Sequence, residues 1–328
     1  MTGSALHTEF RHRSVLACEA PEALVHNPDG LYVDATFGRG GHSRTILGKL
    51  SDQGRLIAFD RDPEAIAAAA SIADPRFCIV HSPFSAMKSE LAALGVTQAD
   101  GILMDIGVSS PQIDDPERGF SLRADGPLDM RMDTSRGMTA AEWIARASEK
   151  EIAEALRTYG EERFAGRIAQ AIVREREEHP IVRTAQLGEL IARSVPRNAS
   201  DPRQNPATRS FQAIRIVVNG ELDELSAALE SAGALLRPDG RLVVISFHSL
   251  EDRIVKRFFE RGAHPEREID PRLALRAAEM PLPLWRDAVR VKPGKEECEE
   301  NPRARSAVMR WAVRTDRAWD DGQGGNAR

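Results

Sequence analysis

The chain has 328 residues, 41% of them hydrophobic, and a formal net charge of −5 at pH 7. This length suits one large α/β domain with an insertion, or two domains. The negative net charge excludes a basic surface over the whole molecule, so nucleic acid would have to bind at local patches. No run approaches the length of a membrane span, and the N-terminal segment is charged where a signal peptide needs an apolar core. We therefore expect a cytoplasmic protein without membrane segments.

The three cysteines give little reason to expect a metal. Cys18, Cys78 and Cys298 are far apart in the chain and form no CxxC pair. That spacing argues against a zinc site or a disulfide framework and suits a reducing compartment.

The first hundred residues alternate short apolar runs with helical segments. A helix is expected from residue 43, and another begins at Asp62 and Pro63, which resemble an N-cap and a first-turn proline. This alternation predicts βαβ units and a parallel sheet, with the loops after the strands gathered at one edge, where ligands bind. The four expected strands are at residues 31–36, 55–60, 76–81 and 101–106.

The alternation stops after about residue 115. A long ordered loop is expected at 115–137, because the segment is rich in Gly, Pro and charge, and residues 139–195 have a helical pattern. The later elements are expected to be a polar loop at 197–209, one long helix at 210–236, a turn at 237–240, a fifth strand at 241–247, and an antiparallel pair of strands at 288–291 and 306–313.

These elements predict an α/β protein with a discontinuous sheet domain. Residues 1–113 and 209–316 would form the sheet domain, and residues 114–208 a helical insertion between its fourth and fifth strands. Residues 317–328 would be a disordered tail.

The stretch VDATFGRGGHS, residues 33–43, follows the first strand and opens a helix. Gly38, Gly40 and Gly41 would let the backbone adopt positive φ and come close to a ligand. A dinucleotide fingerprint would need glycine at position 43, which is Ser43. A glycine-rich turn without a ligand is the alternative explanation of this loop.

Acids at the ends of the first two strands favour a particular cofactor. Asp60 closes the second strand, where an acid can accept hydrogen bonds from ribose hydroxyls. Asp34 would repel a pyrophosphate but attract an ammonium group, and the two together fit S-adenosylmethionine. Phe84, after the third strand, could cover the adenine, although a core phenylalanine is the commoner role.

Several stretches together resemble the bacterial small-subunit ribosomal RNA cytosine-N4 methyltransferases, the methyltransferase H family. They run from about residue 12 to residue 310 and cover nearly the whole chain. These stretches are HRSVL, VDATFGRGGHS, FDRDPEA, MDIGVSSPQIDDPERGFSLRADGPLDMRMD, TAAEW, FQAIRIVVNGEL, LVVISFHSLEDRIVKRFF and NPRARSA.

The resemblance implies a class I methyltransferase fold, with a Rossmann-like, mostly parallel sheet and a helical substrate-recognition insertion. It also implies S-adenosylmethionine as the cofactor and the N4 amine of a cytidine in 16S ribosomal RNA as the substrate. For His42, a role through its backbone N–H at the start of a helix is the alternative. The implied cofactor contacts are Gly40, Gly41, His42, Asp60, Phe84, Asp105 and Gln112.

The stretch MDIGVSSPQIDD, residues 104–115, carries the residues expected to be catalytic. Its Ser-Pro pair resembles the [Ser/Asp/Asn]-Pro-Pro-aromatic motif of amino-methylating DNA enzymes. Such a transfer needs acceptors that turn the lone pair of the amine toward the methyl group, and no strong base. We expect Ser110 to offer its hydroxyl and Pro111 to fix the loop so that carbonyls face the amine.

This stretch departs from that motif at Gln112 and Ile113, which replace Pro and an aromatic. Stacking on the base would therefore come from Phe120 or Phe247. The alternative is that Ser109 and Ser110 are ordinary turn residues.

Two further features leave alternatives open. His248 could reach the mouth of the pocket, but a helix-capping role around Ser249 explains that segment equally well. Two groups of arginines would hold RNA phosphates, although a solvated charge run is the better explanation for any single one. They are Arg193, Arg197, Arg203, Arg209 and Arg215 in the middle of the chain and Arg303, Arg305, Arg310 and Arg314 near its end.

Three functions remain to be compared. The first is the ribosomal RNA methyltransferase, acting on free RNA or, as we expect, within the small subunit, with a homodimer left open. The second is an NAD-dependent oxidoreductase, which Ser43 in place of a third glycine argues against. The third is an RNA-binding assembly factor without catalysis, which the retained Asp60 and Asp105 argue against.

Overall fold

The structure, a computed structural model, describes residues 14–196, 205–270, 272, 276 and 279–319. Within these residues, seven strands form one sheet in the order β3-β2-β1-β4-β5-β7-β6. The strands are β1 (Leu31–Asp34), β2 (Arg55–Asp60), β3 (Phe77–His81), β4 (Ala99–Asp105), β5 (Leu236–Ser246), β6 (Trp285–Val291) and β7 (Val308–Arg314).

The sheet is parallel except at one side. Strands β1 to β5 pair in parallel, and β7 then pairs antiparallel with both β5 and β6. The four early strands, the fifth strand and the closing antiparallel pair are therefore confirmed. The predicted α/β class, with a mostly parallel sheet, is confirmed as well.

Side chains alternate between the two faces of the sheet, as period-two strands require. Val33, Ile102 and Val244 belong to the core under one face, whereas Leu103 and Val243 belong to the core under the other. Helices α4 (Met87–Ala93), α11 (Glu221–Leu235) and α12 (Ser249–Ala263) cover the first face. The second face is covered by α1 (Glu19–Leu24) and α2 (Gly41–Leu47), together with the 3-10 helix η5 (Pro302–Ser306).

Shorter elements complete the sheet domain. Helix α3 (Pro63–Ala69) packs small alanine side chains near β2 and β3. Its N-terminus confirms the prediction, because Asp62 accepts a hydrogen bond from the Glu64 backbone and Pro63 occupies the first turn. The remaining elements are α5 (Ser110–Asp114), α13 (Lys295–Glu300) and the 3-10 helices η1 (Phe84–Ala86), η2 (Pro116–Arg118) and η3 (Pro265–Glu268).

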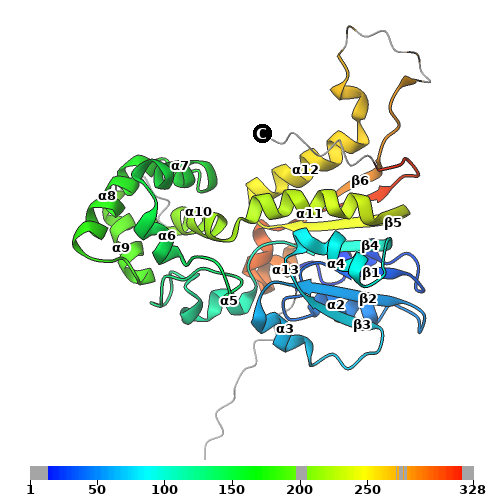
Figure 1. Ribbon diagram of the computed structural model, residues 1–328, viewed down its shortest axis with the longest axis horizontal. Coiled ribbons are helices and arrows are strands. Elements are labelled where there is room, and N and C mark those ends of the chain that lie inside the picture. The colour runs from blue at the N-terminus through cyan, green and yellow to red at the C-terminus, as the bar shows by residue number, and fades with distance from the viewer. Residues whose placement is uncertain (1–13, 197–204, 271, 273–275, 277–278, 320–328) are drawn as a thin grey trace, which may run out of the picture.

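Five helices with their own core lie at one end of the molecule, beside the sheet domain (Figure 1). Apolar residues at helical spacing bury one face of each helix, for example Ile168 and Ile172 of α8. The long loop expected at 115–137 joins this helical unit to α5. The helices are α6 (Ala140–Arg146), α7 (Glu149–Tyr159), α8 (Ala165–Glu178), α9 (Thr184–Ser194) and α10 (Thr208–Asn219).

The single long helix expected at 210–236 is wrong. Helices α10 and α11 meet at Gly220, whose φ of +60° ends the first helix and begins the second. Glycine adopts this left-handed conformation without the steric cost that a Cβ would bring. Because Phe211 packs in the helical unit and Leu225 in the sheet domain, we propose Gly220 rather than residue 208 as the boundary of the insertion.

Three other expectations differ from the structure. The turn at 237–240 lies inside β5, where Asp239 has φ of +65° and the pairing with β4 shifts in register. Trp319, which the predicted tail includes, packs against Phe258. The rest of that tail, 320–328, and most of the polar loop at 197–209 lie outside the described residues.

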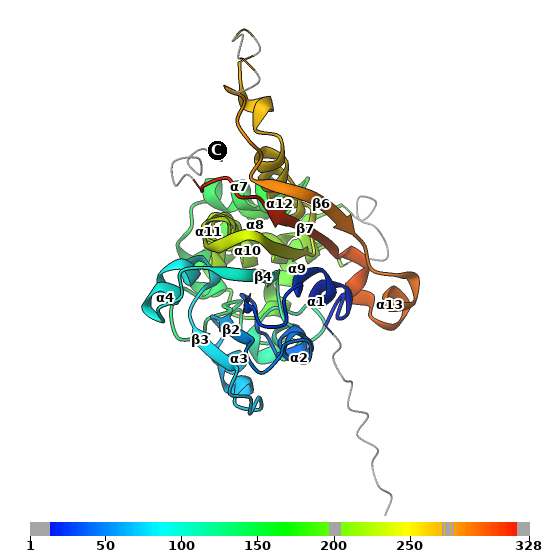
Figure 2. The same ribbon diagram turned by 90° about the vertical axis from the view of Figure 1, so that its right-hand side faces the viewer.

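The view in Figure 2, turned by a quarter, separates the layers of the sheet domain. It places α4 toward one side of the sheet and α1 and α13 toward the other. Within the described part of the chain, no helix is both long enough and apolar enough to cross a bilayer.

We expect Gly220→Ala to lower the free energy of unfolding by about 1–2 kcal/mol, because a Cβ strains the left-handed backbone. An added Cβ at Gly220 would meet nothing within 4 Å, so the effect is purely conformational. Urea unfolding followed by circular dichroism measures it. The matched control is Gly166→Ala in α8, where the space is also open and alanine should stabilise the helix by about 0.5–1 kcal/mol. Equal effects of the two substitutions would contradict the explanation.

Candidate functional site

The carboxyl ends of the parallel strands bring most of the predicted cofactor residues to one edge. Asp60 and Asp105 are the last residues of β2 and β4, and Phe84 begins η1 after β3. The glycine loop lies between β1 and α2 at this same edge. The grouping follows from the parallel topology, since strands β1 to β5 all end there.

The glycine loop takes the conformation that its sequence predicts. Gly38 and Gly40 have φ of +57° and +75°. An added Cβ at Gly38 would meet nothing within 4 Å, so the backbone there faces open space. A Cβ at Gly41 would instead collide with the side chain of Ser14. The loop thus offers exposed backbone at its tip and tight packing at its base.

Asp60 lies against this loop. Its carboxylate accepts hydrogen bonds from the backbone of Gly38 at 2.7 Å and of Asp62 at 2.9 Å. Removal from water raises the pKa of Asp60 to about 6, although these two hydrogen bonds oppose the rise. A carboxylate oriented by backbone donors is suited to accepting hydrogen bonds from ribose hydroxyls.

The role expected for Asp34 is wrong. Its side chain is completely buried and accepts a hydrogen bond from the Ser43 hydroxyl at 2.6 Å. Burial raises its pKa, and the contact with Ser43 lowers it only in part. Asp34 therefore fixes the first turn of α2 through Ser43, and it has no exposed surface that an ammonium group could contact. The hydrogen bond to Asp34 also gives a reason for serine at position 43, where a dinucleotide fingerprint has glycine.

His42 and Asp105 face each other with unused hydrogen-bonding capacity. The Nε2 of His42 is 3.4 Å from Asp105 Oδ2. Among the described residues, neither ring nitrogen of the buried His42 nor Oδ1 of Asp105 has a hydrogen-bond partner. Burial alone would lower the pKa of His42, but the carboxylates of Asp105, Asp34 and Glu297 raise it overall.

Buried polar groups without partners are costly, so an arrangement of this kind points to a ligand. A cationic imidazole fits a ligand carboxylate, and the Asp105 carboxylate fits an ammonium group. S-Adenosylmethionine carries both groups at its amino-acid end and a ribose at the other. The donor set of this edge therefore fits that cofactor.

Gln112 lies at the edge but is already engaged. Its side-chain oxygen accepts from the Ser109 backbone at 2.9 Å, and its nitrogen donates to Asp62 Oδ2 at 2.7 Å. The side chain is buried. The amide oxygen thus caps α5, and the amide nitrogen holds α5 against the turn after β2. These two contacts explain glutamine at this position without a ligand.

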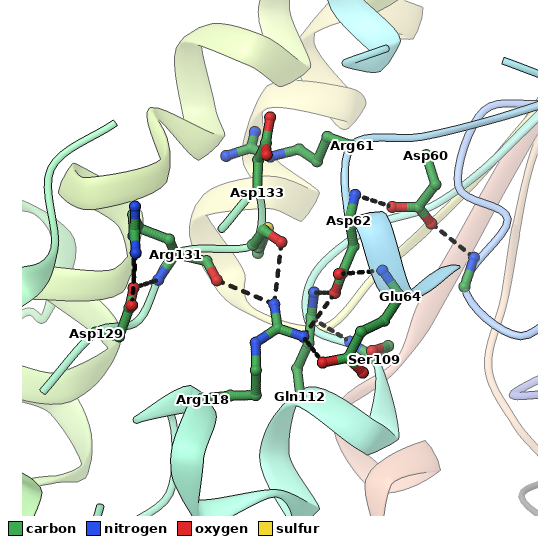
Figure 3. Close-up of polar contacts among 12 residues, drawn as sticks. Asp60, Arg61, Asp62, Glu64, Ser109, Gln112, Arg118, Asp129, Arg131 and Asp133 are labelled. Carbon is green, nitrogen blue, oxygen red and sulfur yellow. Dashed lines mark hydrogen bonds and ion pairs between the residues drawn. The ribbon is translucent and has the colours of Figure 1, made fainter. Parts of the chain in front are cut away.

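Arg118 is the centre of the largest polar network of the site, and sequence reasoning missed it (Figure 3). One of its nitrogens donates to Asp62 at 2.9 Å and to Glu64 at 3.1 Å. The other donates to the backbone carbonyls of Arg131 and Met132 at 3.1 and 3.0 Å. The residue is 5% exposed. Arg118 is one of four arginines in the loop at 115–137, and nothing in the sequence distinguishes it from the other three.

Asn219 fixes the same loop from the other side. Its side-chain oxygen accepts from the Met132 backbone at 2.8 Å, and its nitrogen donates to the Met130 carbonyl at 2.7 Å. Arg61, which follows Asp60, donates to the Asn219 carbonyl at 2.9 Å. The last residue of α10 is therefore tied both to the long loop and to the turn after β2.

The residues expected to be catalytic begin α5. Ser110 and Pro111 occupy its first turn, with Ser109 as the N-cap. The Ser110 hydroxyl accepts a hydrogen bond from Arg303. Of the two aromatic candidates for stacking, Phe247 lies beside Gly107 in the loop before α5, whereas Phe120 packs against the helical unit.

His248 and not Ser249 caps α12, so the capping alternative is the one that the structure supports. His248 Nε2 is 3.0 Å from Glu251 Oε1. Burial would raise the pKa of Glu251, but His248 and Arg215 lower it overall. Glu221 completes a group whose ligand-type atoms lie within 4.8 Å of one another. Arg215 already pairs with both oxygens of Glu221 at 2.8 Å, so this group carries its own cation.

Three arginines of the two predicted patches are paired with acids, and RNA binding by the others stays a prediction. Arg215 is paired as described, Arg303 contacts α5, and Arg310 pairs with Asp252 at 2.7 Å. The side chain of Arg305 donates to the Cys298 carbonyl. Arg314 donates to backbone carbonyls. Arg193 and Arg209 are exposed on the helical unit, and Arg197 and Arg203 lie outside the described residues.

Comparison with known proteins identifies relatives over nearly the whole chain. A family model described as the MraW methylase family matches residues 9–315. A protein of Chromobacterium violaceum named ribosomal RNA small subunit methyltransferase H is 58% identical over 318 residues, which cover 95% of this chain and 98% of the relative. A protein of the same name from Cupriavidus pinatubonensis is 56% identical, with 95% of each chain covered. A solved rRNA methylase from Streptococcus thermophilus overlaps 90% of this chain and 92% of its own, with 9% identity and a TM-score of 0.37.

Asp60 should make the affinity for S-adenosylmethionine depend on pH. Its pKa is about 6, and the ionised form is the better acceptor for ribose hydroxyls. As the pH falls through this value the carboxyl gains a proton, so affinity should fall by roughly tenfold between about pH 7.5 and pH 5. Calorimetric titration across that range, compared with Asp60→Asn, measures the effect. An acid limb of the same size in the variant would remove Asp60 from the site.

Arg118→Ala should lower the free energy of unfolding by about 3–5 kcal/mol, because it leaves the buried Asp62 carboxylate without its cation. The control is Arg39→Ala, which breaks an exposed pair with the same Glu64 that Arg118 contacts. That loss should stay within about 1 kcal/mol. Urea unfolding of both variants tests the difference, and similar losses would show that Asp62 does not depend on Arg118.

Proposed function

This chain belongs to the MraW methylase family, and from that premise we infer that it is an S-adenosylmethionine-dependent methyltransferase that methylates the N4 amine of a cytidine in 16S ribosomal RNA. The observation that carries the mechanism is the position of α5. Its first residues, Ser110 and Pro111, follow β4 at the sheet edge that also carries Asp60 and the glycine loop. An amine held at α5 is therefore next to the cofactor site.

The residues of the edge divide the binding of the cofactor between them. Asp60 takes the ribose, His42 and Asp105 take the amino-acid end, and the open backbone at Gly38 admits the ligand. Phe84 is assigned to the adenine. When bound, S-adenosylmethionine would supply a methyl group whose carbon the amine can attack, with the neutral thioether as the leaving group. The protein adds placement, because an activated donor needs alignment more than further activation.

The α5 loop prepares the acceptor nitrogen. The lone pair of a cytosine N4 amine is delocalised into the ring, so it must turn out of the ring plane before it can attack. The Ser110 hydroxyl accepts one N–H of the amine, and Pro111 fixes the first turn of α5 and adds no N–H of its own. The carbonyls expected to face the amine do not do so, because those of Ser109 and Pro111 accept hydrogen bonds from Ile113 and Asp115 inside the helix. The methylated nitrogen is acidic and gives its extra proton to solvent when the product is released, so no strong base is required.

The RNA is assigned to the helical unit and the edge beside it. We propose that residues 114–219 recognise the substrate, with Arg193 and Arg209 as exposed phosphate contacts and Phe247 next to the target base. The substrate is proposed to be ribosomal RNA within the small subunit, which places the enzyme in the cytoplasm. A homodimer stays a prediction, and light scattering of the purified protein tests it.

The central experiment uses small subunits and free 16S ribosomal RNA from a strain that lacks the gene. Each is incubated with the enzyme and S-adenosylmethionine, and mass spectrometry identifies the modified nucleoside. N4-methylcytidine should form on the subunits, and with Asp60→Ala it should form more slowly when S-adenosylmethionine is below saturation. A methyl group on another atom would refute the assignment to the amine. Methylation of free RNA alone would refute the assignment to the assembled subunit.

Ser110→Ala should lower the single-turnover rate of methylation by roughly ten- to a hundredfold, because a hydrogen bond in a site without water is lost. The affinity for S-adenosylmethionine should stay near that of the wild type, since the side chain lies outside the cofactor contacts. Both substrates are kept saturating, so that the measured rate is that of the chemical step. A rate within about twofold of the wild type would leave Ser110 as a turn residue.

A further inference from the structure

The C-terminal segment 295–307 packs beside α5, although almost two hundred residues separate the two in sequence. Glu297 in α13 accepts a hydrogen bond from the Leu16 backbone at 2.7 Å. Ala304 and Ala307 are buried in the core under the second face of the sheet, with Leu103. The backbone that carries Arg303 is therefore fixed by the Glu297 hydrogen bond before it and by core packing after it.

Arg303 reaches α5 with two of its nitrogens. One donates to the Ser110 hydroxyl, and the other is 2.6 Å from Asp114 Oδ1. Ser110 and Asp114 are four residues apart, so they lie on the same face of the short helix. Gln112, which lies between them in sequence, donates to Asp62. One guanidinium thus holds one side of α5, and the buried network of Asp62 holds the other.

We propose that Arg303 is a positioning residue for methyl transfer, which acts by fixing the orientation of the Ser110 hydroxyl. The proposal rests on the amine-holding role of Ser110 given above. A free serine hydroxyl rotates among three staggered positions. A donor from Arg303 engages one lone pair of the oxygen and leaves the other to accept an N–H of the target amine.

Asp114 makes this arrangement compatible with the reaction. The amine nitrogen gains positive charge as the methyl group arrives, so an isolated guanidinium nearby would oppose the transfer. The Asp114 carboxylate offsets the charge of Arg303 and leaves its hydrogen bonds in place. The same pairing argues against Arg303 as a phosphate contact, because a neutralised guanidinium attracts a phosphate weakly.

The test measures single-turnover methylation, cofactor affinity and the salt dependence of RNA binding. Arg303→Ala should lower the rate at saturating substrates by about tenfold, with cofactor affinity and salt slope unchanged. Arg303→Lys keeps the charge and one donor, so it should recover part of the rate. If Arg303→Ala does not fold, Arg303→Lys replaces it in every comparison. Arg286→Ala, at an exposed ion pair with Asp239, should match the wild type.

A double-mutant cycle with Ser110→Ala decides whether Arg303 acts through the hydroxyl. In the Ser110→Ala background, loss of Arg303 should change the rate by less than about twofold. A further tenfold loss in that background overturns the proposal, as does a lower salt slope with an unchanged rate, which would make Arg303 a phosphate contact. A slow Ser110→Ala with a normal Arg303→Ala overturns the positioning role alone. A normal Ser110→Ala overturns the amine-holding role as well.

Discussion

The organisation of this molecule depends on one buried carboxylate, that of Asp62. It caps α3 through the Glu64 backbone, accepts the amide of Gln112 at 2.7 Å, and pairs with Arg118 at 2.9 Å. A buried charge is tolerated only where hydrogen bonds and an opposite charge compensate it. The turn after the second strand, the α5 helix and the long loop must therefore adopt their positions together. Since the backbone of Asp62 also orients Asp60, the cofactor edge and the proposed catalytic loop share one support.

The same network fixes the helical unit relative to the sheet. Arg118 donates to the Met132 carbonyl, and Asn219 binds the backbone of that same residue, so the loop is held between the end of β2 and the end of α10. Arg61 adds a direct link from the sheet domain to Asn219. Because Gly220 follows immediately, the left-handed break lies at the point where α10 is tied down. A substrate bound by the helical unit would thus be presented to the same edge of the sheet as the cofactor.

Features that depend on neighbours in sequence could be predicted, and features that depend on distant partners could not. Strand positions, the Asp62 cap and the closing antiparallel pair follow from periodicity and local chemistry, and all are confirmed. The break at Gly220 could not be predicted, because a helix tolerates an isolated glycine and only the tertiary ties of Asn219 select the left-handed form. The acid partners of two arginines could not be predicted for a related reason. Arg303 and Arg310 have their acids 189 and 58 residues away, so two arginines of a stretch without nearby acids are neutralised in the fold.

The distribution of acids at the sheet edge also explains the type of ligand it can hold. Asp34, Asp60 and Asp105 lie at the ends of neighbouring strands, and the pKa of Asp60 is raised by the charges of Asp62 and Asp34 as well as by burial. A pyrophosphate placed in the glycine loop would add negative charge to this group and would be opposed by it. A ligand with a sulfonium and an ammonium group instead offsets the charge of Asp60 and Asp105, whereas Asp34 stays buried against Ser43. The charge of this edge therefore favours a cationic nucleoside over a dinucleotide, and Ser43, which donates to the buried Asp34, replaces the glycine that a dinucleotide fingerprint needs.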